Sequence, residues 1–515
     1  MLKKLQNWLG IGPLGPLANV PFPQLAAAWM RRVQTWPLTP PATQDGTEVA
    51  ILVTPWLGSA VPFYNIEIAL MLAAAGQRVV LLWDSTDVIG NAPAPHETAA
   101  IAEALKIVPP WIKTIDVSQI VPSENWARDT DGAWIDSMLF ENGVWRMRGE
   151  TTATHYVERK QALLPRIREH IGRVRELFAT RKWHWLLIPG GVWGVSSIYV
   201  SAAEQSGCRY ATYDCAIHSV TVCHQGVACH QLDLADAAKM VARNFTTEQL
   251  AYLRGRAWKE LEERIEGRGN QQGLQMRAAG KTTYDFNVII PLNQRWDAAA
   301  LGRGRLFATV EEWIVGLLRW AESEPAARLC VRQHPCERFK EWRGSDDIAA
   351  LIQRENRAGA RVRFVAAGES ISTYELLPTA KAVVPYTSSV GVEAGMLGIS
   401  VIASAHNYYD RASFVRRPET QEEFFNLLSQ AVRNDLKPPQ EGASDAALIY
   451  HLIQECNITP TIFAAGPVEY LEWVKIPPRE LWAQPSCVDL RESLLTGQPL
   501  SYLMSRRILS TANLL

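Results

Sequence analysis

A group of polar residues follows an apolar stretch of strand type, residues 328–331, and reads Arg332-Gln333-His334-Pro335. Ligands of an α/β sheet collect at the carboxyl ends of its strands, and Arg and His side chains there can bind an anionic phosphate. Pro335 would fix the direction in which the backbone leaves the strand. The alternative is that His334 only caps the strand end. We treat Arg332, His334 and Pro335 as candidate phosphate-binding residues.

A second motif combines small hydroxyl residues with glycine and a carboxylate, after the predicted strand 382–385, and reads Thr387-Ser388-Ser389-Val390-Gly391-Val392-Glu393. Hydroxyl residues that open a helix present N–H and O–H donors to a phosphate, and the helix dipole favours the anion. Glu393 could accept hydrogen bonds from sugar or ribose hydroxyls. The alternative is a plain helix cap by Ser388 or Ser389 with Glu393 as its partner, worth about 1 kcal/mol. Its position in the same predicted sheet as His334 favours the binding interpretation.

A carboxylate, Asp214, stands at the end of the predicted strand 209–213 and could act as a general base towards an acceptor hydroxyl. Its alternative role is that of a turn or capping residue. Asp233 and Glu204 are the fallback candidates.

The elements that must position these residues alternate regularly. Apolar, β-branched runs predict strands at 49–54, 78–84, 185–189 and 209–214, with helices at 66–75 and 197–206 between them. A second series predicts strands at 286–291, 328–332, 362–365, 382–385 and 400–403, and helices at 310–322, 348–355, 372–377 and 392–397. Such alternation is typical of parallel, doubly wound sheets. We therefore predict an α/β protein of two Rossmann-like domains facing a cleft.

The predicted organisation has five parts, because 515 residues exceed what one hydrophobic core usually serves. They are an N-terminal extension (1–45), an N-terminal acceptor domain (46–245), a charged helical linker (246–280), a C-terminal nucleotide domain (281–438) and a helical C-terminal tail (439–515). We expect the tail to pack across one or both domains.

Composition excludes several classes of protein. The chain is 47% hydrophobic and 20% charged, as an ordinary folded protein is, and its net charge of -1 argues against a nucleic-acid binder. Eight cysteines are too sparse for a disulfide scaffold, and no apolar run reaches the roughly 20 residues that span a bilayer. We expect a cytoplasmic protein. The segment 1–10 could alternatively lie on the inner membrane face, with Leu5, Trp8 and Leu9 inserted and Lys3 and Lys4 at the head groups.

Two patterns suggest metal ions but fit no metal site well. Cys215, His218, Cys223, His224, Cys229 and His230 have spacings that match no standard zinc framework, so buried thiols and polar loop histidines are the expectation. The sequence Asp129-Thr130-Asp131 is followed by Gly132 and is typical of a turn. We predict no metal and no cofactor.

The second half of the chain resembles the capsule polysaccharide biosynthesis family. The resemblance rests on residues 291–297, on Glu311-Glu312-Trp313, on 332–335, and on 387–394 with Gly398, within a match over about 285 to 430. That family includes β-Kdo transferases that use CMP-Kdo, and its His-Pro and Ser-Ser pairing is similar to that of bacterial sialyltransferases.

The resemblance implies a GT-B-like fold and a glycosyltransferase. It implies that His334 and Ser388 or Ser389 hold the donor phosphate, that Glu393 lies near the ribose or base, and that Asn293 and Asp297 line the same cleft. Related members often have Glu-Gly where this chain has Asp214-Cys215. The expected activity is metal-independent, inverting transfer from a nucleotide sugar, CMP-Kdo being one candidate, to a surface polysaccharide or glycolipid, within or beside a capsule synthesis complex. A sugar-nucleotide 2-epimerase, a polyol-phosphate transferase and a non-catalytic glycan-binding scaffold remain open.

Overall fold

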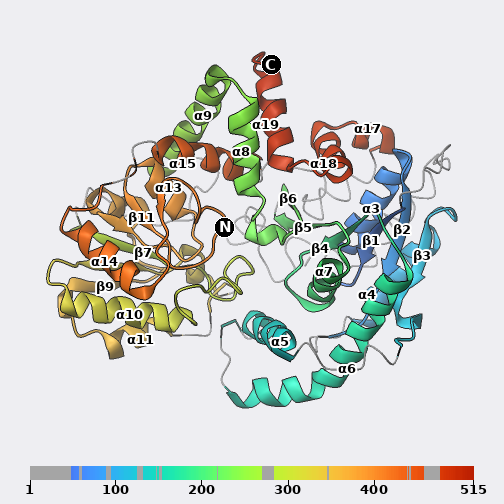
Figure 1. Ribbon diagram of the computed structural model, residues 1–515, viewed down its shortest axis with the longest axis horizontal. Helices are drawn as coiled ribbons and strands as arrows, with labels where there is room; N and C mark the ends of the chain where they lie inside the picture. The colour runs from blue at the N-terminus through green and yellow to red at the C-terminus, as the bar shows by residue number, and fades with distance from the viewer. Residues whose placement is uncertain are drawn as a thin grey trace. The chain divides into compact units, whose positions relative to one another are not determined.

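The computed structural model divides into two compact units (Figure 1). It describes residues 48–56, 61–88, 94–123, 132–146, 148–149, 153–216, 219–268, 284–340, 342–344, 347–437, 439, 442–456 and 476–515. Unit 1 spans Met1–Asn142, Thr152–Asp233 and Cys456–Met504, and unit 2 spans Gly143–Thr151, Leu234–Glu455 and Ser505–Leu515. The proposed membrane-surface segment and Asp129-Thr130-Asp131 lie outside the described residues.

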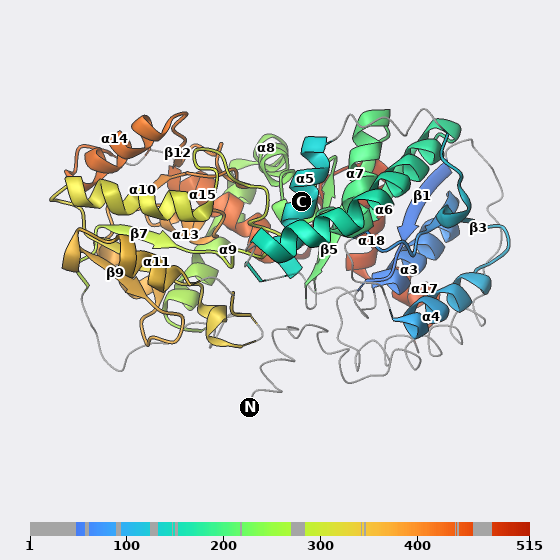
Figure 2. The same cartoon turned by 90° about the horizontal axis from the view of Figure 1, so that it is seen from below.

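Unit 1 contains a six-stranded sheet of order β3-β2-β1-β4-β5-β6, parallel except for the β5–β6 pair. Apolar residues of β1, β2 and β4 pack against α6 and α7 on one face, and α3 packs on the other (Figure 2). The strands are β1 (Glu48–Val53), β2 (Arg78–Trp83), β3 (Lys113–Asp116), β4 (Trp185–Pro189), β5 (Tyr210–Ala216) and β6 (Ser219–His224). The helices are α3 (Val61–Ala74), α4 (Pro95–Lys106), α5 (Gly132–Arg146), α6 (Ala153–Thr180), α7 (Gly194–Ser206), α17 (Pro478–Trp482) and α18 (Pro485–Thr496).

Unit 2 contains a second six-stranded sheet, entirely parallel, of order β12-β11-β10-β7-β8-β9. Helix α10 lies on one side of it and α13 on the other (Figure 1). The strands are β7 (Val288–Pro291), β8 (Leu329–Arg332), β9 (Val362–Val365), β10 (Ala382–Val383), β11 (Ser400–Ile402) and β12 (Val415–Arg416). The helices are α8 (Leu234–Asn244), α9 (Thr247–Ile265), α10 (Val310–Ser323), α11 (Ile348–Glu355), α12 (Thr373–Leu376), α13 (Val390–Met396), α14 (Gln421–Val432) and α15 (Gly442–His451).

Continuous burial along β7 shows that the sheet of unit 2 is covered on both faces. Val288, Ile290 and Leu292 face the core formed with α10, α11 and α14, whereas the intervening Ile289 is equally buried on the opposite face. Near-continuous apolar strands of this kind are typical of parallel sheets sandwiched between helices. The predicted pair of Rossmann-like domains is confirmed.

Most predicted elements are present with small shifts in their ends. The predicted β4, β9 and α11 have the observed bounds, and α13 begins at Val390 rather than Val392. The prediction that Asp214 ends its strand is wrong, because β5 continues to Ala216 and forms an antiparallel pair with β6. The sequence analysis also did not predict β3, β6, β12, α5 or α6.

The C-terminal region is helical where it is described. It contains α15, a π-helical turn at Leu452–Cys456, α17, α18 and α19 (Leu500–Thr511), and its residues are divided between the two units. None of the helices in the described part of the chain is long and apolar enough to cross a membrane.

Candidate functional site

The strand order of unit 2 reverses at β7. From β7 the chain adds β8 and β9 on one side, then crosses over to add β10, β11 and β12 on the other. The carboxyl ends of β7 and β10 therefore flank the topological switch point, where doubly wound sheets bind ligands. Strand β7 also separates the two sequence motifs, so the ends of β8 and β10 lie about 10 Å apart at two strand spacings.

Asn293 connects the two sides of the switch point. It follows β7, and its side-chain oxygen accepts a hydrogen bond from the backbone N–H of Thr387, which follows β10, at 3.0 Å. The structure therefore brings together two of the residues that the sequence analysis selected.

An open pocket lies beside this bridge. Its volume of about 490 Å³ includes its mouth to solvent. Most of its wall is apolar or aromatic, with Trp313 and Tyr386 in contact at a ring-centroid distance of 5.6 Å. The Nε1 donor of Trp313 is buried and has no hydrogen-bond partner among the described residues. The lining residues are Leu292, Asn293, Arg295, Ala300, Val310, Trp313, Gln333, Glu337, Gly344, Ile348 and Tyr386. Such a wall with a few polar groups is typical of small-molecule sites.

Arg332 is 1% exposed at the end of β8. Its Nη1 donates to the carbonyl oxygen of Ala366 at 2.7 Å, whereas Nε and Nη2 have no hydrogen-bond partner among the described residues. Unsatisfied donors on a buried cation are costly, so an anion beside them would be stabilised.

His334 is held in a defined tautomer. Its Nδ1 accepts a hydrogen bond from the backbone N–H of Cys336 at 3.3 Å, and Pro335 opens the following 3₁₀ turn, Pro335–Arg338. Burial and, second, the neighbouring Arg332 cation lower the pKa of His334 to about 4. The ring is therefore neutral near pH 7 and carries its proton on Nε2, so His334 can donate a hydrogen bond to a phosphate but cannot neutralise its charge.

The Thr387–Ser389 segment presents several unused donors. Thr387 is 7% exposed, and its hydroxyl has no partner among the described residues. The backbone N–H groups of Ser388 and Ser389 form no hydrogen bond within the same described set, and the Ser388 hydroxyl accepts only a long bond, 3.4 Å, from the N–H of Val390. Ser389 precedes α13 and forms no side-chain bond to the helix backbone, but its hydroxyl lies within hydrogen-bonding reach of the Glu393 carboxylate. A helix cap therefore does not account for the Thr387 hydroxyl.

Gly391 and Glu393 have structural partners. A Cβ atom on Gly391 would lie 2.3 Å from the hydroxyl oxygen of Tyr409, so only glycine allows this ring to approach. Glu393 is 2% exposed and forms an ion pair of 3.1 Å with Arg264 of α9. Burial raises the pKa of Glu393, and the contact with Arg264 opposes that rise. Its proposed contact with a ribose or base stays a prediction.

The side chain and backbone of Asp297 stabilise the turn that follows it. Its Oδ1 accepts a hydrogen bond from the N–H of Ala299 at 3.2 Å, and its backbone oxygen accepts from Ala300. Burial raises its pKa. The structure does not place it on the wall of the pocket.

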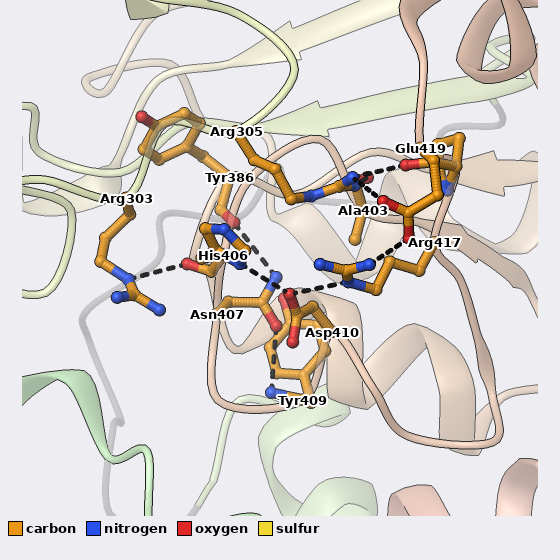
Figure 3. A network of polar contacts seen from close by, with 11 residues as sticks. Arg303, Arg305, Tyr386, Ala403, His406, Asn407, Tyr409, Asp410, Arg417 and Glu419 are labelled. Carbon is orange, nitrogen blue, oxygen red and sulfur yellow. Dashed lines mark hydrogen bonds and ion pairs between the residues drawn. The ribbon is translucent and has the colours of Figure 1, made fainter. Parts of the chain in front are cut away.

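A loop after β11 supports the second motif, and the sequence analysis missed it. Ser404, Asn407 and Tyr409 donate side-chain hydrogen bonds to the backbone oxygens of Pro385, Tyr386 and Ser388, respectively. Figure 3 shows the bond from Asn407 to Tyr386. The loop is itself anchored by Arg303, whose Nε donates to the oxygen of His406 at 2.9 Å, and by the Arg417–Asp410 ion pair at 3.3 Å. No local sequence pattern indicates such contacts, because they join segments of different strands.

In unit 1, Asp214 lies in the carboxyl-terminal half of β5, whereas the fallback candidates Glu204 and Asp233 lie near the amino end of that strand. Asp214 is partly buried and lies opposite Thr221 in the β5–β6 pair. By strand alternation it shares a face with Thr212, whose methyl group is 3.2 Å from a Cβ built on Gly191. Gly190 has φ 68°, and its Cβ would lie 2.5 Å from Trp56, which supports the tight-turn interpretation of these glycines. Glu204 accepts a hydrogen bond from Tyr210 at 2.8 Å, and Asp233 lies beside the Cys223 thiol.

The cysteine and histidine cluster does not form a metal site where it is described. Cys223 is buried, and His224 is hydrogen-bonded to Ser493 at 3.1 Å. Among the residues with described side chains, no group of three or more His, Cys, Asp or Glu is arranged to hold a metal ion.

A family model matches part of the chain. Residues 239–428 match the family described as capsule polysaccharide biosynthesis protein, which confirms the resemblance predicted from the sequence. No curated protein sequence shows a significant match.

Among solved structures, the chain is similar to the β-Kdo 2,4 transferase KpsC of Thermosulfurimonas dismutans, with 14% identity, 57% of this chain and 87% of that chain covered, and a TM-score of 0.35. The β-Kdo 2,7 transferase of the same organism gives 16% identity, 50% and 79% coverage, and a TM-score of 0.30. A UDP-N-acetylglucosamine 2-epimerase from Neisseria meningitidis gives 10% identity, 79% and 100% coverage, and a TM-score of 0.23.

Proposed function

We propose that this chain is an inverting, metal-independent glycosyltransferase that moves a sugar from a nucleotide donor, CMP-Kdo in the first instance, to a growing capsular polysaccharide or glycolipid. The observation that carries the proposal is the clustering of pocket and unused polar donors at the switch point of unit 2. The family match over 239–428 covers the same residues. The reaction is assigned to the cytoplasmic side of the inner membrane.

The donor phosphate is assigned to the edge formed by Arg332, His334 and the Thr387–Ser389 segment. Arg332 supplies the positive charge, because His334 is neutral near pH 7. The buried hydroxyl of Thr387 and the open N–H of Ser389 supply neutral donors. Preorganised donors of this type stabilise charge on a leaving phosphate without a metal ion. The adjoining pocket, with its apolar and aromatic wall, accommodates another part of the same donor.

Acceptor-dependent release of CMP tests the activity. Purified protein is incubated with CMP-, UDP- and CDP-activated sugars, with and without a capsular oligosaccharide or glycolipid acceptor. CMP release only in the presence of acceptor is the expected result. Release without acceptor, or conversion of the donor to an epimer, would contradict transfer.

Two substitutions test the donor site. His334→Ala and Ser388→Ala should each raise the Kd for the donor, by about 5- to 10-fold for the loss of a neutral hydrogen bond. Ser323→Ala, at the exposed end of α10, is the matched control and should leave the Kd unchanged. Unaltered donor binding in both site variants would refute the site assignment.

Asp214→Asn tests the general base separately. We expect kcat to fall by about 100-fold or more, with the donor Kd unchanged, because a missing base affects proton transfer and not donor binding. A variant that keeps the kcat of the wild type would exclude Asp214 as the base and leave the donor site unaffected.

A further inference from the structure

The segment from Pro385 to Ser388 is held through its backbone oxygens by side chains of the loop after β11. Ser404 Oγ donates to Pro385 O at 3.4 Å, and Asn407 Nδ2 donates to Tyr386 O at 3.2 Å. The Tyr409 hydroxyl donates to Ser388 O. Figure 3 shows Asn407 and Tyr409 on one loop, within a network of arginine and carboxylate contacts that anchors it.

Peptide geometry relates each of these bonds to an N–H group. In a planar trans peptide the C=O of one residue and the N–H of the next point in opposite directions. A donor bound to Tyr386 O therefore orients the N–H of Thr387, and a donor bound to Ser388 O orients the N–H of Ser389. Hydrogen bonds in series also polarise one another, so a bound oxygen makes the N–H of the same peptide a stronger donor.

The Tyr386–Thr387 and Ser388–Ser389 peptides differ in the hydrogen bonding of their N–H groups. Asn293 accepts the N–H of Thr387 at 3.0 Å, so Asn293 and Asn407 hold both ends of the first peptide. The Ser388–Ser389 peptide is held at its oxygen by Tyr409, and by the N–H of Gly391 at 3.1 Å, whereas the N–H of Ser389 has no partner among the described residues. The orphaned Thr387 hydroxyl, on a side chain more than nine-tenths buried, is a second and independent sign of a missing ligand beside it.

Packing contacts fix the position of the Tyr409 ring. It is 1% exposed, its ring is stacked on Phe414 at 5.9 Å, and its approach requires glycine at 391. Its neighbour Tyr408 meets it edge to face at 4.7 Å and forms no hydrogen bond among the described residues. Of these two adjacent tyrosines, only Tyr409 donates a hydrogen bond to the Ser388–Ser389 peptide.

We propose that Tyr409 is a positioning residue that acts through the Ser388–Ser389 peptide and aims the Ser389 N–H at the donor phosphate. Asn407 and Asn293 support it by fixing both ends of the Tyr386–Thr387 peptide in the same segment. This inference rests on the proposed function. Tyr409 contacts no part of the donor itself, so its effect is confined to the phosphate and does not extend to the nucleoside.

The test compares a ligand that has the phosphate with one that lacks it. The Kd values of CMP and of cytidine are measured by ligand-observed NMR for the wild-type chain, Tyr409→Phe and Tyr408→Phe. Tyr409→Phe should raise the Kd of CMP by about 3- to 10-fold, the loss of one neutral hydrogen bond, and leave the Kd of cytidine within the error. Tyr408→Phe should change neither value.

Asn407→Ala provides a second, uncharged variant, which removes the donor to Tyr386 O together with the acceptor for the Tyr409 N–H. This variant should also raise the Kd of CMP and leave the Kd of cytidine unchanged. Equal rises in both Kd values, or an unchanged CMP affinity in Tyr409→Phe, would overturn the positioning role while the proposed function stands. A wild-type chain that binds neither ligand would instead overturn the proposed function and this inference with it.

Discussion

The buried pair Arg264–Glu393 connects helix α9 to the second motif, and its removal should destabilise unit 2 strongly. Both side chains are 2% exposed, and Nη1 lies 3.1 Å from Oε1. Gln454 accepts a further hydrogen bond from Arg264, and the ring of Tyr450 lies 5.6 Å from the guanidinium carbon. Arg264→Met would leave a buried carboxylate with no cation beside it.

The expected cost follows from that geometry. Breaking one partner of a buried ion pair costs about 3–5 kcal/mol, because the remaining charge stays desolvated. For a unit of this size the melting temperature should fall by on the order of 10 °C. Glu393→Gln combined with Arg264→Met removes both charges and should recover a large part of the loss, giving a coupling free energy of about 2–3 kcal/mol.

The pH dependence of stability provides a second test of the Arg264–Glu393 pair. Burial already raises the pKa of Glu393, and loss of the Arg264 cation should raise it further. A carboxyl whose folded pKa lies above its unfolded value binds more protons when folded, so the stability of the Arg264→Met variant should fall as the pH rises above the unfolded pKa. Its deficit relative to the wild-type chain should therefore be smaller at pH 5 than at pH 8.

Thermal unfolding followed by circular dichroism, at pH 5 and pH 8, measures both effects. Additive losses in the double variant, or a deficit that does not change with pH, would refute the claim that an uncompensated Glu393 causes the instability. The exposed pair Lys239–Asp236 offers a matched control, since its removal should change the melting temperature little.

Two further predictions concern the donor site. Because the pKa of His334 is about 4, its ring does not titrate between pH 6 and 8, and the affinity for a CMP-sugar, whose phosphodiester keeps one charge, should not change with pH over this range. An affinity that falls with a midpoint near pH 6.5 in the wild-type chain and not in His334→Gln would show that the imidazolium binds the phosphate instead. Gly391→Ala should lower the melting temperature by several degrees, at a cost of about 1–3 kcal/mol, because its Cβ would displace Tyr409. The control is Gly255→Ala in α9, whose Cβ meets no atom within 4 Å and which should raise stability by up to about 1 kcal/mol. Equal effects in the two variants would argue against the clash with Tyr409.

The sequence alone determined the local elements and the places where strands end in polar residues. The apolar run 185–189 predicted β4 with the observed bounds, because a strand covered on both faces must be continuously apolar. The alternation of apolar residues with Arg363 predicted the edge strand β9, also with the observed bounds. The same reasoning located Arg332 and Thr387 at carboxyl edges. It failed for β6, which pairs antiparallel with β5, and so misplaced Asp214 at a strand end.

The tertiary structure decided how those edges combine. Strand order cannot be read from periodicity, since every apolar strand can pair with any other, and only packing of the whole sheet places β7 between β8 and β10. Contacts such as Asn293 with Thr387, Tyr409 with Ser388 and Arg264 with Glu393 join residues far apart in the chain and carry no local signal. Residue types and spacing therefore indicated the chemistry, and the fold determined which donors remain available to a ligand.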